Sequence, residues 1–123
     1  MKTLTLDTEL AWSAGFLDGE GNYGMQTARR KDRKDQYSFR IQAAQVHREP
    51  LDRLQAALGG NVTGPYGPYG DNKQPYFQWN ITGYAEAKEA LFKLLPFHSP
   101  IKAEQGLKAW ADFLEMRARR DGI

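Results

Sequence analysis

The residues best suited to chemistry are two carboxylates in the glycine-rich segment Asp18-Gly19-Glu20-Gly21. The preceding residues are predicted to form a helix, so both acids lie at a helix C-terminus. The partial negative charge of a helix C-terminus disfavours a carboxylate there by roughly 0.3–1 kcal/mol. A cation offsets that cost, and hard divalent cations such as Mg²⁺ or Ca²⁺ prefer carboxylate and backbone oxygens. The segment therefore predicts a divalent-metal site at the end of a helix.

The helix that must position these acids has a small side and a large apolar side. Its start is expected to be capped by Thr8 or Asp7. The small side, at spacings of three and four, comprises Ala11, Ala14, Gly15 and Asp18. The large side, expected in the chain's own core, comprises Leu10, Trp12, Phe16 and Leu17. Because glycine inside a helix costs about 0.5–1 kcal/mol, the small side predicts close approach of a second helix. No other segment has this pattern, so that helix is expected to come from a second copy of the chain.

The nine residues SAGFLDGEG, from Ser13 to Gly21, resemble the signature of the LAGLIDADG homing endonucleases. The outright matches are Ala14, Gly15, Asp18 and Gly21, and the conservative replacements are Phe16, Leu17, Gly19 and Glu20. Ser13 departs from the pattern, which has leucine there. The resemblance implies that Glu20 and the backbone carbonyl of Gly19 bind catalytic Mg²⁺, with Mn²⁺ or Ca²⁺ as substitutes. It also implies that two motif helices pack together and place two acids over the scissile phosphates of DNA.

Polar residues downstream are predicted to form a surface that binds double-stranded DNA. Residues 22–29 and 37–45 alternate as two strands, joined by a turn with five basic residues. Residues 75–82 give a second amide-rich strand face. Guanidinium, amide and hydroxyl groups bind phosphates and base edges. The residues expected to contact DNA are Gln26, Arg29, Arg30, Lys31, Arg33, Lys34, Arg40, Gln42, Lys73, Gln78 and Asn80. The alternative is an ordinary solvated hairpin, since charge runs are often merely exposed.

The remaining elements complete an αββαββα(α) order, which predicts an α+β fold with a four-stranded antiparallel sheet and helices on one face. After the first hairpin come a helix over residues 48–58, strands over 61–65 and 75–82, and helices over 83–95 and 101–119. The apolar stripe of the last helix is expected to be Leu107, Trp110, Ala111 and Leu114. Residues 1–123 are expected to form a single domain.

The resemblance extends to two further candidate catalytic residues. Gln45 ends the second strand, at a family position that organises active-site water. Lys102 matches the family's basic residue near the scissile phosphate. The chain has no second DGEG segment, so one chain supplies one acid, and a two-fold homodimer would supply two. The predicted function is a site-specific endonuclease that cuts a pseudo-palindromic duplex as a homodimer.

Composition excludes several other classes of protein. The chain has no cysteine, which excludes disulfides and thiolate zinc sites, and its two histidines lack metal-ligand spacing. No run of 18 apolar residues and no signal peptide are visible, so the expected location is cytoplasmic, without a membrane partner.

Three other functions compete with this prediction. An inactive DNA-binding regulator or RNA-splicing maturase would keep binding without Mg²⁺-dependent cleavage. An ordinary α+β interaction domain would show weak DNA affinity with little salt dependence. An EF-hand is rejected, because Tyr23 stands where its loop requires glycine and Arg29 where it requires glutamate.

Overall fold

The computed structural model describes residues 2–31, 33–68 and 74–122. The elements in chain order are α1 (Lys2–Glu20), β1 (Gly21–Ala28), β2 (Gln36–Gln45), α2 (Glu49–Leu58), β3 (Asn61–Tyr66), β4 (Tyr76–Ile81), α3 (Tyr84–Leu94), the short 3₁₀ turn η1 (Leu95–Phe97) and α4 (Pro100–Arg120). The predicted element order is confirmed. The four strands form one antiparallel sheet in the order β1-β2-β4-β3.

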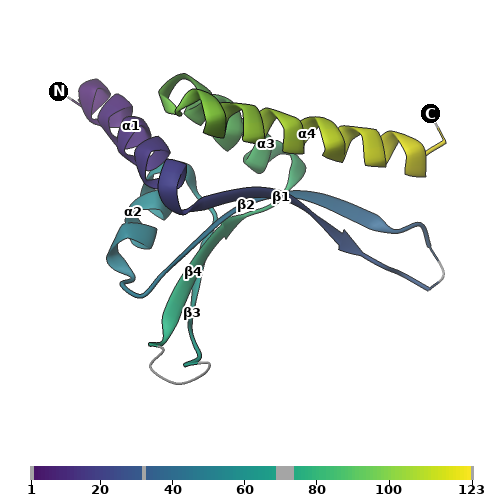
Figure 1. Ribbon diagram of the computed structural model, residues 1–123, viewed down its shortest axis with the longest axis horizontal. Helices are drawn as coiled ribbons and strands as arrows, with labels where there is room; N and C mark the ends of the chain where they lie inside the picture. The colour runs from purple at the N-terminus through teal and green to yellow at the C-terminus, as the bar shows by residue number, and fades with distance from the viewer. Residues whose placement is uncertain (1, 32, 69–73, 123) are drawn as a thin grey trace.

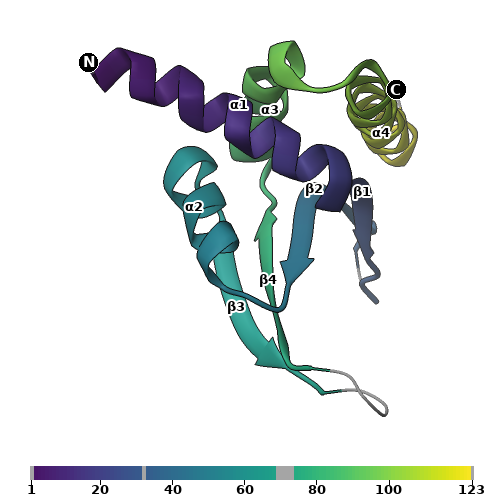
Figure 2. The ribbon, with the colours of Figure 1, turned by 60° about the vertical axis from the view of Figure 1, so that its left-hand side comes forward.

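The helices lie together on one side of the sheet, and the opposite side is left open (Figure 1). The β1–β2 hairpin and the β3–β4 hairpin extend away from each other beyond the region where the strands overlap. Figure 2 shows that α1 crosses this overlap region and that α2 lies beside it over β3 and β4. The fold is therefore a two-layer α+β structure with a free sheet surface.

Strict alternation along the strands separates a buried face from an open one. The buried face packs against the helices through Phe39, Ile41, Ala43, Trp79 and Ile81. The intervening residues of β2 and β4, among them Arg40, Gln42 and Asn80, lie on the other face and are half-buried. The period-two pattern predicted these faces, because successive side chains of a strand point to opposite sides.

Helix α1 is longer than predicted. It begins at Lys2, so the expectation that Thr8 or Asp7 caps its start is wrong. Contacts with α2 begin just after the predicted cap: Arg53 donates to both carboxylate oxygens of Glu9, at 2.7 and 2.8 Å, and its guanidinium lies 4.1 Å from the Trp12 ring centroid. These hydrogen bonds also lower the pKa of Glu9. These contacts hold α1 against α2 from Glu9 onwards.

The buried face of α4 differs from the predicted stripe. Gly106, Trp110 and Phe113 are buried, whereas Leu107 and Leu114 are 43% and 40% exposed. A Cβ at Gly106 would lie 2.8 Å from Leu91 Cδ1, so the missing side chain lets α4 pack closely against its neighbours. Of the predicted stripe only Trp110 is buried, and the prediction missed Gly106, whose small size the tight contact requires. None of the described helices, α4 included, is long and apolar enough to cross a membrane.

Candidate active site at the junction of the first helix and first strand

The candidate site is built around the abrupt transition from α1 to β1. Glu20 is the last residue of α1 and is exposed, as is Gly19 before it. Gly21 begins β1, and a Cβ there would lie 2.8 Å from the backbone oxygen of Leu17. Only glycine therefore permits the strand to leave the helix at this point. The turn leaves the Glu20 carboxylate and the Gly19 backbone at the surface, where they are accessible to a ligand.

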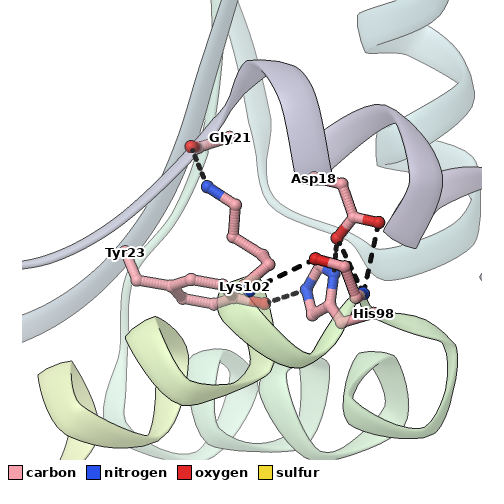
Figure 3. A network of polar contacts seen from close by, with 6 residues as sticks. Asp18, Gly21, Tyr23, His98 and Lys102 are labelled. Carbon is pink, nitrogen blue, oxygen red and sulfur yellow. Dashed lines mark hydrogen bonds and ion pairs between the residues drawn. The ribbon is translucent and has the colours of Figure 1, made fainter.

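Lys102 reaches this junction from α4, far along the chain. Its Nζ donates a hydrogen bond to the Gly21 carbonyl oxygen at 3.0 Å (Figure 3). Ser99 caps α4, because its Oγ accepts from the Lys102 backbone N–H at 3.3 Å. The structure thus places the ammonium group of Lys102 beside the residue that follows Glu20.

A buried histidine links the end of α1 to β1 and to the start of α4. The His98 imidazole has no exposed surface; its Nδ1 lies 2.8 Å from Asp18 Oδ1, and its Nε2 lies 2.6 Å from the Tyr23 hydroxyl oxygen (Figure 3). The geometry fits a tautomer in which Nδ1–H donates to Asp18 and Nε2 accepts from Tyr23. The Ser99 N–H also donates to Asp18, at 3.2 and 3.3 Å from its two oxygens. These bonds fix the last turn of α1, and with it the segment that carries Glu20.

Burial raises the pKa of the Tyr23 phenol well above its usual range, and the nearby negative charge of Asp18 raises it further. The hydroxyl therefore stays protonated and available to donate to His98. Sequence reasoning missed both His98 and Tyr23 as site residues. The Asp18–His98 contact joins positions 80 residues apart, and no local pattern indicates such a pair.

Gln45, the third predicted catalytic residue, is the last residue of β2 and is half-buried. Gln45 pairs with Phe77 of β4, and on the other side of β2 the first residue of β1, Gly21, pairs with Ala43. Gln45 is thus two residues, or about 7 Å along the strand, beyond the position that pairs with Gly21. The strand end that carries Gln45 thus lies near the α1–β1 junction. Lys102 contacts the junction directly, through the Gly21 carbonyl.

The small side of α1 is only partly free. Ala11 and Gly15 are exposed, and a Cβ at Gly15 would meet no atom within 4 Å. Ala14, also predicted for the dimer interface, is fully buried in its own chain's core and offers no exposed surface in the single chain. Asp18 is likewise engaged within its own chain by His98 and Ser99, rather than presented to a partner. The exposed stripe therefore runs through Ala11, Gly15 and Gly19 towards Glu20.

The predicted DNA-contacting residues occupy two regions of the sheet. Those on the open face are Gln26, Arg40, Gln42, Gln78 and Asn80. Those at the exposed tip between β1 and β2 are Arg29, Arg30, Lys31, Arg33 and Lys34. Lys73 lies outside the described residues. The chain has 15 acidic residues, yet none is in any of the four strands, so the open face presents no carboxylate to repel a polyanion.

The C-terminal end of α4 supports the base of the basic hairpin, a role the sequence did not indicate. Arg120 donates from Nη1 to the Asp35 carbonyl oxygen at 3.2 Å, and its guanidinium lies 5.9 Å from the Tyr37 ring centroid. Because Arg120 is anchored in a helix, the hairpin is held against the body of the protein.

The described residues of a single chain do not assemble a multidentate metal site from their side chains. Within the ranges the structure describes, no three His, Asp or Glu residues cluster closely enough to hold an ion. The oxygen donors at the junction, the Glu20 carboxylate and the Gly19 carbonyl, are nevertheless of the type that Mg²⁺ and Ca²⁺ prefer. They fit a hard cation, provided that further oxygens come from outside the chain.

The fold is similar to solved structures of homing endonucleases. I-CvuI in complex with a DNA target in the presence of Mg has a TM-score of 0.72 and 23% identity, covering 95% of this chain and 73% of that one. I-CvuI in complex with its own target in the presence of Ca has a TM-score of 0.67 and 25% identity, over 84% of this chain and 64% of that one. The LAGLIDADG homing endonuclease I-SmaMI bound to cleaved DNA has a TM-score of 0.68 and 18% identity, over 89% of this chain and 37% of that one. No family model and no curated protein matches the sequence. The fold that the motif resemblance implies is confirmed by these structures.

Proposed function

Because this chain has the fold of the LAGLIDADG homing endonucleases and carries their motif at the end of α1, we propose that it is a site-specific endonuclease acting on double-stranded DNA. The observation that carries the proposal is the position of Glu20. Its exposed carboxylate lies where α1 passes directly into a sheet whose strands contain no acidic residue. A nuclease needs this combination of a metal-binding acid and a surface that tolerates phosphates.

Glu20 and the Gly19 carbonyl would hold the catalytic divalent cation. When bound there, the cation would supply Lewis-acid chemistry toward the phosphate and its attacking water. The ammonium group of Lys102, held beside the junction by the Gly21 carbonyl, adds positive charge near the phosphate. Gln45, on the neighbouring strand end, orients water through its amide.

The enzyme would act as a homodimer through the exposed stripe of α1. One chain contributes one motif acid, and its described residues contain no cluster of three metal-binding side chains. A two-fold axis along the stripe would bring the two Glu20 residues together and complete the oxygen set. The open space beside Gly15 is consistent with a second helix packing there. Such a dimer would cut a pseudo-palindromic site on both strands.

The test is a Mg²⁺-dependent cleavage selection on a randomised duplex library, run in parallel with Glu20→Gln. We expect enrichment of one two-fold-related site, and a loss of cleavage of roughly 10²-fold or more in Glu20→Gln with binding retained. Glu115→Gln is the matched control, because Glu115 is an exposed α4 residue that pairs with Arg119. Cleavage that survives in Glu20→Gln would refute the assignment of the acid. Binding of a selected duplex without cleavage would instead identify a non-cutting DNA-binding protein.

A further inference from the structure

The register of the sheet places four carboxamide side chains in one row across the open face. Asn22 of β1 pairs with Gln42 of β2, Gln42 with Asn80 of β4, and Asn80 with Asn61 of β3. This is the one row of the open face, within the described strands, in which all four strands take part. We call it the amide row.

The amide row is free to bond to something outside the chain. Asn22 and Asn61 are exposed, and Gln42 and Asn80 are half-buried. Over the part of the chain that the structure describes, none of the four carboxamides makes a hydrogen bond to another residue. Polar groups taken out of water usually find partners, and the two half-buried amides, Gln42 and Asn80, have none within the described chain. The row is therefore open to a ligand that supplies both donors and acceptors.

Charge and amides are segregated on this surface. The only charged residue in the four strands is Arg40, in the adjacent row with Gly24. The basic residues gather instead at the exposed hairpin tip, over residues 29–34. Phosphates are neutralised by such cations and carry no sequence information, whereas base edges are read by groups in the groove. The centre of the sheet is therefore equipped to read bases rather than to attract phosphates.

The chemistry of the amide row indicates which bases it would contact. Asn and Gln pair in bidentate fashion with the N6 and N7 of adenine in the major groove, and Arg pairs with the O6 and N7 of guanine. We propose that the amide row reads adenines, giving each half-site an A·T-rich centre, and that Arg40 reads a guanine beside it. This inference rests on the proposed function, because it names the sequence class that the same DNA-binding face selects.

The spacing of the open-face rows along the strands sets the spacing of the base pairs that they contact. Consecutive open-face rows are two residues apart, or about 6.7 Å, which corresponds to about two base pairs of B-DNA. The guanine read by Arg40 should lie about two base pairs from the adenines, on the side of the β1–β2 tip. Six such rows, from Ala28 and Gln36 to Tyr66 and Tyr76, span roughly 33 Å, or about 10 base pairs.

The experiment is a binding selection on a randomised duplex library in Ca²⁺, using the full chain, followed by affinity measurements with single base-pair changes. We expect A·T pairs at the central positions of each half-site and a G·C pair about two positions away. Gln42→Ala and Asn80→Ala should each relax the central preference, because each removes one bidentate amide–adenine pair, which provides about 5- to 150-fold discrimination. Gln42→Arg should shift the preference at its position from adenine to guanine. Gln55→Ala is the matched control, because this exposed amide lies on α2 and donates only to Gly60.

The outcomes separate this inference from the proposed function. An enriched site whose central positions show no A·T preference, or a preference unchanged in Gln42→Ala and Asn80→Ala, overturns the role of the amide row while leaving a site-specific DNA-binding protein. Folded protein that enriches no duplex overturns both. Circular dichroism and thermal denaturation of each variant establish that the comparison is made between folded proteins.

Discussion

Replacing Gly15 with leucine should separate the stability of the single chain from the formation of the proposed dimer. Gly15 lies in the interior of α1, where glycine is about 0.8–1.0 kcal/mol less favourable than alanine, and leucine is nearly as good as alanine. A Cβ at this position meets no atom of the described chain within 4 Å. We therefore expect Gly15→Leu to raise the free energy of unfolding of the monomer by about 1 kcal/mol, or its Tm by about 3–5 °C.

The same substitution should disrupt the dimer. If two α1 helices cross at Gly15, each chain inserts a leucine side chain into a contact sized for glycine. Overpacking costs typically about 1–3 kcal/mol per site. Two copies across a two-fold axis then cost about 2–6 kcal/mol, which weakens the dimer by roughly 30-fold to 10⁴-fold in Kd. DNA cleavage should fall with it, because the two Glu20 carboxylates no longer meet.

The assay combines light scattering on the chain with and without duplex DNA, thermal denaturation at several protein concentrations, and cleavage of the selected site. A dimer makes Tm depend on protein concentration, and this dependence should disappear in Gly15→Leu. Ala111→Leu is the matched control, because it adds a leucine at an exposed position of a different helix. That helix, α4, packs on β1 and β2 and is not the proposed dimer interface. If Gly15→Leu dimerises and cleaves like the wild type, α1 is not the dimer interface. If it destabilises the monomer, the space beside Gly15 is not free.

Two further predictions concern stability. Ser13 is fully buried, and its hydroxyl has no hydrogen-bond partner in the described chain. Ser13→Ala should therefore raise the free energy of unfolding, measured by denaturant titration, by about 1 kcal/mol. A decrease in the free energy of unfolding would show that the hydroxyl is hydrogen-bonded. Because the pKa of Tyr23 is raised in the folded state, the unfolded chain loses this proton first as pH rises above about 10, so wild-type stability should fall with pH in that range. The free energy of unfolding of Tyr23→Phe should fall less steeply with pH in thermal melts across that range, and an unchanged slope would contradict the raised pKa. At pH 7 the variant should be less stable than the wild type by about 1–3 kcal/mol, because the His98 Nε2 loses its partner.

Local sequence patterns predicted much of the fold. Period-two alternation placed Arg40, Gln42, Gln78 and Asn80 on one face of the sheet, because side-chain direction in a strand depends only on position parity. The glycine-rich motif predicted that the helix ends within residues 18–21, and α1 ends at Glu20, where a Cβ on the following Gly21 would clash with the last helical turn. These features depend on residues close together in the chain.

The side of a helix that is buried was less predictable than the faces of the strands. The α4 helix carries apolar residues on two sides, and the predicted stripe of Leu107, Trp110, Ala111 and Leu114 matched the buried side only at Trp110. The buried side is selected by Gly106, whose missing side chain permits a close contact with Leu91 and Tyr23. On α1, Ala14 resembled an interface residue by size, but the turn of the helix places it in the core.

The sequence by itself determined the motif acid, the order of elements and the two faces of the sheet, since each follows from short-range periodicity, turn chemistry or the motif. Only the tertiary structure decided that His98 holds Asp18 from 80 residues away, that Lys102 reaches the Gly21 carbonyl, and that four carboxamides align across four strands. The physical reason is that strand register and helix packing are set by the whole core at once. Contacts between distant segments depend on that packing, and no local pattern encodes them.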